Sequence, residues 1–168
     1  MKTIGLLTII ALTAVSLPVG GGMRVIQPGS VEDLQHRIIT AARLKGLSPA
    51  LALAVAQVES TFKPGTHCTA ERKSQSCGLF QVWVPTARYL KYTGPVADLV
   101  KPDISIELGT LHLQKCQARY GHNVAKVACC HNAGLQRPAT RCTVDPGVAE
   151  YVSKVSTAYT AWNAKISN

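Results

Sequence analysis

The chain has 168 residues, with 18 Lys and Arg against 9 Asp and Glu, which gives a formal net charge of +9. Its 46% hydrophobic and 16% charged residues exclude a disordered chain and a highly charged coiled coil, and its length favours a single domain. A basic protein of this size is expected to meet acidic polymers, namely nucleic acid, anionic lipid or an anionic cell wall.

The N-terminal segment, residues 1–22, is predicted to be a cleaved export signal. Met1-Lys2 supplies a positive start, residues 4–19 carry no charge and are mostly apolar, and Ala14-Val15-Ser16 has the small-x-small form of a cleavage site. The alternatives are a buried helix and an uncleaved anchor, although this apolar run is shorter than the roughly 20 residues that a spanning helix needs. We therefore expect a mature domain over residues 23–168, exported to the periplasm or outside the cell, without a stable membrane span.

Two helices are expected at the start of this domain. Ser30, with Asp33 three residues later, forms a variant capping box before an apolar stripe, and Gly46 is expected to end the first helix. Ser48 and Pro49 form the N-cap and the first turn of the second helix, which is the most apolar of the chain.

The rest of the chain is predicted to be mostly helical after one irregular segment. Residues 64–83 are rich in Pro, Gly, Ser and Thr and predict a loop or a small β excursion. Further helices are expected over residues 85–91, 103–120, 123–130 and from 145 to near the C-terminus, with Asp103, Asn123 and Asp145 as caps. In the last of them, apolar residues repeat at alternating spacings of four and three, which is typical of a core-facing stripe. The expected fold is mainly α, with an irregular or small β loop after the second helix.

Six cysteines lie in the expected mature domain, at Cys68, Cys77, Cys116, Cys129, Cys130 and Cys142. In an oxidising compartment an even number of cysteines favours disulfides. Cys68 and Cys77 enclose a short loop and form the favoured pair, whereas the pairing of the other four stays open, with Cys129 and Cys130 on different sides of a helix. Zinc is the alternative, because histidines adjoin two of the cysteines, but no metal-site spacing supports it. We expect neither a metal nor a cofactor.

One carboxylate, Glu59, has an unusual position. It lies late in the most apolar helix, where Val55 and Phe62 are its neighbours one turn away. Such a group is either solvated or ion-paired, or its acid form is favoured by desolvation. Downstream, Gly78-Leu79-Phe80-Gln81 forms an apolar turn whose Gln amide can lie opposite the carboxylate, and His131-Asn132-Ala133-Gly134 ends a helix.

These segments resemble the lytic transglycosylase domain of the lysozyme superfamily. The shared motifs are Glu-Ser-x-Phe from Glu59, Gly-Leu-Phe-Gln from Gly78, Asn-Ala-Gly from Asn132, and Tyr-Val from Tyr151 in the last helix. Their order and approximate spacing also match, over nearly the whole mature chain. The resemblance implies an α+β lysozyme-like fold and cleavage of the glycan strand of peptidoglycan between N-acetylmuramic acid and N-acetylglucosamine.

The resemblance also implies roles for single residues. Glu59 is the implied catalytic acid, and Gln81 is an implied contact to the sugar amide. The substrate-binding candidates are Ser74, Gln81, His131, Asn132 and Tyr151. His131 stands where many members have Tyr, and it could either hydrogen-bond the Glu59 carboxyl group or only fill space. The nearest members are small exported enzymes of secretion and conjugation machines, so such an apparatus is an expected partner besides the glycan, and we expect a monomer.

The implied reaction needs one carboxylate. Protonated Glu59 gives its proton to the leaving oxygen, and the N-acetyl carbonyl of the muramic residue stabilises the developing cation. Glu59 then deprotonates the muramic hydroxymethyl group, which closes an anhydro ring without consuming water. We expect apolar surroundings to raise the pKa of Glu59 and so to make it an acid near neutral pH.

Three other functions stay open at this point. A lysozyme-type hydrolase of the same bond would use a second carboxylate, for which Glu71 in the loop is the candidate. A non-catalytic wall-binding component of a secretion system or virion would keep a cleft, although the presence of Glu59 argues against it. Nucleic-acid binding is suggested by charge alone and is not expected, because basic residues cluster only at Arg72-Lys73 and aromatic residues are few.

Overall fold

The computed structural model describes residues 26–66, 75–136 and 140–167. The predicted export signal, and with it Cys68, Glu71 and Ser74, lie outside these residues. In chain order the elements are α1 (Val31–Leu44), α2 (Pro49–Ser60), β1 (Ser76–Cys77), β2 (Val82–Trp83), α3 (Val84–Tyr89), the 3-10 helix η1 (Val96–Val100), α4 (Pro102–Tyr120), α5 (Val124–Ala133), α6 (Arg141–Val144) and α7 (Pro146–Ser167). Within the described ranges, no helix is both long enough and apolar enough to cross a membrane.

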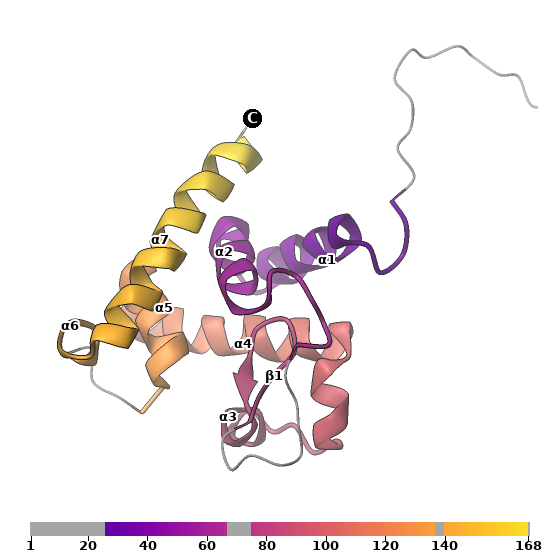
Figure 1. Ribbon diagram of the computed structural model, residues 1–168, viewed down its shortest axis with the longest axis horizontal. Coiled ribbons are helices and arrows are strands. Elements are labelled where there is room, and N and C mark those ends of the chain that lie inside the picture. Colours follow the sequence, from indigo (N-terminus) through magenta and orange to yellow (C-terminus); the bar gives the residue numbers. More distant parts are fainter. Residues whose placement is uncertain (1–25, 67–74, 137–139, 168) are drawn as a thin grey trace, which may run out of the picture.

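Helix α2 is the centre of the fold. Every residue from Ala50 to Ala56 is buried, and α1 and α7 pack against this helix (Figure 1). A helix that is apolar on all sides has to be enclosed by other elements, which is why α2 takes the central place. Glu59 lies in the last turn of this helix, so the candidate acid is attached to the most deeply buried element.

The starts of four helices are confirmed. The side chains of Ser30, Ser48, Asn123 and Asp145 each accept a hydrogen bond from a backbone N–H in the first turn of the helix that follows. These bonds satisfy donors that have no partner inside the helix. The apolar stripe of α7 is confirmed as well, since its members are buried or pack against the core.

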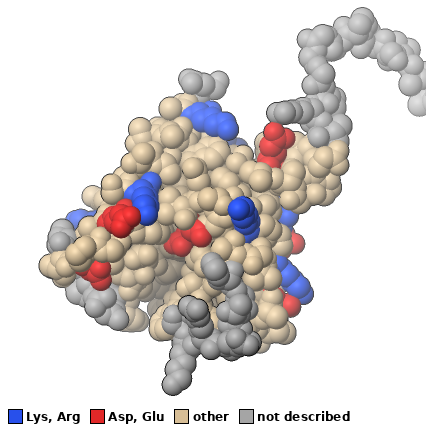
Figure 2. All heavy atoms as spheres, in the orientation of Figure 1, with Lys and Arg blue, Asp and Glu red and all other residues tan. Residues whose placement is uncertain are grey.

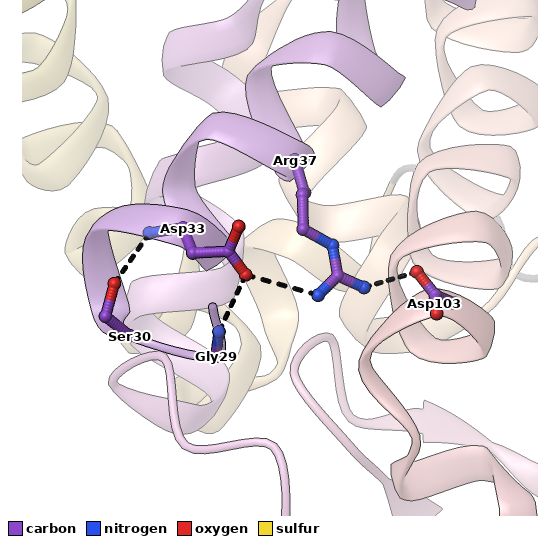
Figure 3. A network of polar contacts seen from close by, with 5 residues as sticks. All are labelled: Gly29, Ser30, Asp33, Arg37 and Asp103. Atoms are coloured by element: carbon purple, nitrogen blue, oxygen red, sulfur yellow. Dashed lines mark hydrogen bonds and ion pairs between the residues drawn. The ribbon is translucent and has the colours of Figure 1, made fainter. Parts of the chain in front are cut away.

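The expected cap Asp103 is wrong. Helix α4 begins at Pro102 after Lys101, which makes no side-chain cap, so Asp103 falls inside the first turn. There its carboxylate pairs with Arg37 of α1, which also contacts Asp33 at 3.4 Å (Figure 3). Asp33 in turn accepts a hydrogen bond from the Gly29 N–H. Asp103 therefore ties the start of α4 to the start of α1.

Two short helices were not predicted, and one predicted end was placed too early. The 3-10 helix η1 lies between Gly94-Pro95 and Lys101-Pro102, which the sequence analysis interprets only as breaks between helices. Helix α6 is a separate short helix before α7. Helix α5 continues to Ala133, three residues beyond the predicted end at Cys130. Both short helices have at most five residues, too few for apolar periodicity to reveal them.

The irregular segment after α2 contains a small antiparallel sheet, as expected. Ser76 pairs with Trp83 and Cys77 pairs with Val82, so the four residues from Gly78 to Gln81 form the connecting turn. Gly78 has a φ of +74°, and a Cβ there would collide with the Leu99 carbonyl and the Ser105 side chain. Only glycine fits this conformation and this close approach.

The connecting turn is wedged between α2 and α4. Leu79 and Phe80 are completely buried. The Ser60 hydroxyl lies 2.9 Å from the Leu79 carbonyl oxygen, and the Phe80 ring lies directly against Gly109 of α4. The turn is thereby fixed to both helices at once.

Two disulfides connect the helices around α5. Cys116 of α4 bonds to Cys130, and Cys129 bonds to Cys142 of α6. The neighbours Cys129 and Cys130 thus point to different partners, as their places on a helix require. Cys77 is also disulfide-bonded, while its predicted partner Cys68 is outside the described residues. The cysteines of these two bonds are 14 and 13 residues apart in sequence. Closing a loop of this length contributes about 3 kcal/mol to the free energy of unfolding.

The contact between Gly109 and Phe80 leads to a stability prediction. Gly109→Ala places a methyl group inside the Phe80 ring volume, so we expect a loss of about 1 to 3 kcal/mol in the free energy of unfolding. Gly147→Ala is the matched control, because the nearest atom to its Cβ is 3.5 Å away, an ordinary contact. Urea denaturation of both variants checks this, and equal stabilities would contradict the wedge.

Candidate active site

A cleft of about 670 Å³ opens beside the end of α2. Glu59, together with His112 of α4 and His131 of α5, lines it, and the segment 76–89 and the stretch 132–136 contribute further lining residues. Among the described lining residues, Glu59 is the only carboxylate. The cleft therefore brings together the end of α2, the turn from Gly78 to Gln81 and the end of α5, three of the four segments singled out in the sequence.

The backbone reverses immediately after Glu59 and Ser60. Thr61 and Phe62 take the left-handed conformation, with φ of 51° and 60°, which is unfavourable for residues with a side chain. The Phe62 ring meets Trp162 of α7 edge to face, with centroids 5.9 Å apart. This aromatic contact helps to hold the strained reversal that places Glu59 at the cleft.

His131 lies between Glu59 and the turn. Its Nε2 is 3.0 Å from the Phe80 carbonyl oxygen and 3.5 Å from the nearer oxygen of Glu59. A carbonyl oxygen only accepts hydrogen bonds, so Nε2 carries the proton. The sequence analysis left open whether His131 hydrogen-bonds Glu59 or only fills space. In the structure its N–H hydrogen-bonds the Phe80 carbonyl, and the same N–H also faces the Glu59 carboxyl group at a longer distance. Its side chain is 2% exposed, against 16% for Glu59.

Tyr151 is buried beside Glu59 and is not among the residues that line the cleft. Burial raises the pKa of Tyr151 well above its ordinary value of 10, and the neighbouring Glu59 carboxylate raises it further. The Tyr151 hydroxyl interacts with the Glu59 carboxylate, although no hydrogen bond of ordinary geometry joins the two groups. Tyr151 is thus a protonated donor held next to Glu59.

His112 was missed by the sequence analysis. Its imidazole is buried and lies against the His131 ring, with centroids 4.8 Å apart and planes 40° apart. Burial, and then the charge that His131 would carry, lower the pKa of His112 from 6.5 to about 3. The available signal was its place in α4 between Leu108 and Cys116, because an imidazole four residues from each belongs to their apolar stripe.

The buried residues around Glu59 carry all of the buried side-chain polar atoms that have no hydrogen bond of ordinary geometry in the described part of the chain. These are both ring nitrogens of His112, Nδ1 of His131 and the Tyr151 hydroxyl. Each such atom costs about 1 to 3 kcal/mol, and in native proteins they concentrate where function requires them. The site around Glu59 is thus the place where this fold gives up stability.

Gln81 and Asn132 both line the cleft. The Gln81 side-chain N–H₂ donates to the backbone oxygens of Thr66 (2.8 Å) and Gly78 (2.9 Å), and its own φ is 43°. Gln81 therefore braces the turn, while a contact to the sugar amide stays a prediction. Asn132 is exposed at the end of α5, and Ser74 lies outside the described residues.

One wall of the cleft is aromatic, which the sequence analysis did not foresee. Trp83 and Tyr89 both line it and are 48% and 55% exposed. Their closeness to the Gly-Leu-Phe-Gln turn in sequence was the signal that could have found them. Across the described ranges, the cleft included, no group of three or more His, Cys, Asp or Glu side chains is arranged to hold a metal ion.

The sequence profile of the Transglycosylase SLT domain family matches residues 36–143. The chain belongs to this family. A protein of Haemophilus influenzae described as a soluble lytic murein transglycosylase is 34% identical over 97 residues, which are 54% of this chain and 16% of the relative. The family expected from the motifs is thereby confirmed.

The fold of this SLT domain is found in a solved relative. The X-ray structure of the lytic transglycosylase Slt of Pseudomonas aeruginosa, an inactive mutant with Gln in place of one Glu, matches with a TM-score of 0.65 at 18% identity. The match covers 79% of this chain and 24% of the other. The expected lysozyme-like fold is confirmed, and the chain spans about a sixth and a quarter of these two proteins.

The buried His112 of this SLT domain predicts a loss of stability in acid. The unfolded chain takes a proton on His112 below about pH 6.5, whereas the folded protein does so only near pH 3. Between these two pH values unfolding binds a proton. The free energy of unfolding therefore decreases as the pH is lowered, by up to about 1.4 kcal/mol per pH unit. Urea denaturation of wild type and His112→Leu from pH 7 to 4 checks this. A slope unchanged in His112→Leu would contradict the buried neutral imidazole.

Proposed function

We propose that this SLT domain cleaves peptidoglycan glycan strands between N-acetylmuramic acid and N-acetylglucosamine and leaves anhydromuramic ends. The observation that carries the proposal is the single described carboxylate in the cleft, Glu59, which adjoins buried N–H and O–H donors. One carboxylate suffices when the substrate supplies its own nucleophile, whereas hydrolysis usually needs two.

In the first step Glu59 acts as the acid. Its carboxyl proton passes to the glycosidic oxygen, the bond to the muramic C1 breaks, and the N-acetyl carbonyl oxygen of the same sugar stabilises the positive charge at C1. The carboxylate that remains lies beside the His131 N–H and the Tyr151 hydroxyl. Both groups can stabilise the new negative charge without moving far, which is the advantage of preorganised donors.

In the second step Glu59 acts as the base. It takes the proton of the muramic hydroxymethyl group, whose oxygen bonds to C1 and closes the anhydro ring. Glu59 is then protonated again and no water has been consumed. The aromatic wall of Trp83 and Tyr89 supports this assignment, because aromatic faces suit the apolar faces of sugar rings and exposed aromatic residues commonly anchor ligands.

The location of the reaction follows from its substrate. We propose that residues 1–22 are an export signal, that residues 23–168 are the mature domain, and that it acts as a monomer in the periplasm or outside the cell. The motifs support a place among the enzymes that accompany secretion or conjugation machines. All of the cysteines in the described part of the chain are disulfide-bonded, which is consistent with an oxidising compartment.

Replacement of Glu59 tests the assignment directly. Glu59→Gln keeps the shape of the side chain but can neither donate nor accept the proton, so we expect cleavage to fall at least about 10²- to 10⁴-fold with the fold intact. Glu150→Gln is the matched control, because Glu150 is an exposed residue of α7 that pairs with Lys154. Release of soluble muropeptides is measured, with circular dichroism as the folding check. Near-wild-type activity of Glu59→Gln would reject the proposal.

Replacement of Glu71 separates the transglycosylase from a hydrolase. A substrate-assisted mechanism makes no use of a second carboxylate, so Glu71→Gln should stay within a few-fold of wild type. Mass spectrometry of the products should then find anhydromuramic ends. Reducing ends, together with equal damage from Glu71→Gln and Glu59→Gln, would identify a two-carboxylate hydrolase instead.

Charge should contribute to wall binding. Without the signal the chain has 17 basic and 9 acidic residues, or +8, and charged groups of both signs are scattered over the face in Figure 2. Because exposed charges are screened beyond about 8 Å at physiological ionic strength, we expect binding to insoluble peptidoglycan to weaken as salt rises. A sedimentation assay with the Glu59→Gln protein measures this. If the amount of bound protein did not change with salt concentration, contacts in the cleft alone would account for the binding.

A further inference from the structure

The support of His131 is unusual for a buried histidine. A functional imidazole is normally oriented by a hydrogen bond at its second nitrogen. Here Nε2 contacts the Phe80 carbonyl and Glu59, whereas Nδ1 is buried and has no partner in the described part of the chain. Hydrogen bonding therefore holds His131 at one end only, and packing has to fix the rotation of the ring.

The surface that packs against the ring is His112. The ring centroids are 4.8 Å apart and the planes are tilted by 40°, so the two rings are in direct contact. His112 has no hydrogen bond at either nitrogen, so its ring contributes a face to this contact. Its pKa of about 3 means that this face is uncharged at any pH near neutrality.

Helix α4 places both supports of His131. Gly109 lets the Phe80 ring lie directly on α4, and Phe80 supplies the carbonyl that accepts from His131. His112 follows Gly109 by three residues, a spacing that puts both on the same side of the helix. The hydrogen-bond acceptor and the stacking face for His131 are thus set by one rigid element.

We propose that His112 is a positioning residue for Glu59: its ring packs against His131 and holds it in the orientation in which the Phe80 carbonyl selects the Nε2–H tautomer and the same N–H faces Glu59. The proposal rests on the proposed function of Glu59. His112 also lines the cleft, but its ring nitrogens are buried and it acts through His131, so we expect it to affect the chemical step more than the binding of glycan.

Three variants test the role of the ring. His112→Ala removes the stacking face, His112→Phe keeps one, and His122→Ala is the control, because His122 is exposed in the turn after α4. We expect His112→Ala to lower kcat about 10- to 100-fold, as small misplacements of catalytic groups do, with the apparent KM for peptidoglycan changed less than about twofold. His112→Phe should recover most of the rate, and His122→Ala should match wild type.

Nitrogen NMR of the His131 ring gives a readout that needs no activity. The wild-type protein should show a single Nε2–H tautomer, and His112→Ala should show a mixture or a ring that takes up a second proton. A wild-type His131 with Nδ1–H would overturn the proposal even if His112→Ala failed to fold. Full kcat in folded His112→Ala, or an unchanged His131 spectrum in that variant, would overturn it as well. Loss of cleavage by the wild type itself would instead reject the function of Glu59.

Discussion

The four-residue turn from Gly78 to Gln81 is the constraint on which the site depends, because it has to fit between α2 and α4 without space to spare. Gly78 admits no side chain, Phe80 lies against Gly109, and the Leu79 carbonyl reaches the Ser60 hydroxyl next to Glu59. The turn thereby sets the distance between α2, which carries Glu59, and α4, which carries His112. Its carbonyls are as important as its side chains, since one of them accepts from His131.

The core has two chemically different parts, an aliphatic part and a part with buried polar atoms around Glu59. Away from the cleft, the core consists of alanines and branched aliphatic residues around α2, which pack well and have no hydrogen bonds to satisfy. Around Glu59 the same core accepts two stacked imidazoles and a phenol with unpaired atoms. In the proposed reaction one carboxylate is protonated and deprotonated in turn, which needs donors that no other group already occupies, and the aliphatic part of the core supplies the stability that this arrangement lacks.

Local signals explain what the sequence could predict. Caps such as Ser30 and Asn123 act within three residues, and the motifs around Glu59 and Gly78 keep their order whatever the loops between them do. Contacts between distant segments could not be read in the same way. The pairing of Asp103 with Arg37 and the stacking of His112 on His131 arise only when α4 meets α1 and α5. An isolated polar residue in an apolar stripe is visible in a sequence, but its partner is not.

The two disulfides of α5 have a consequence for the position of His131. Cys129 and Cys130 bond to partners on opposite sides, and His131 is the very next residue. Loss of both crosslinks would free the last turn of α5 from α4 and α6 at the position that faces Glu59. Reduction of these disulfides would therefore loosen the position of His131 as well as open the loops that the bonds close.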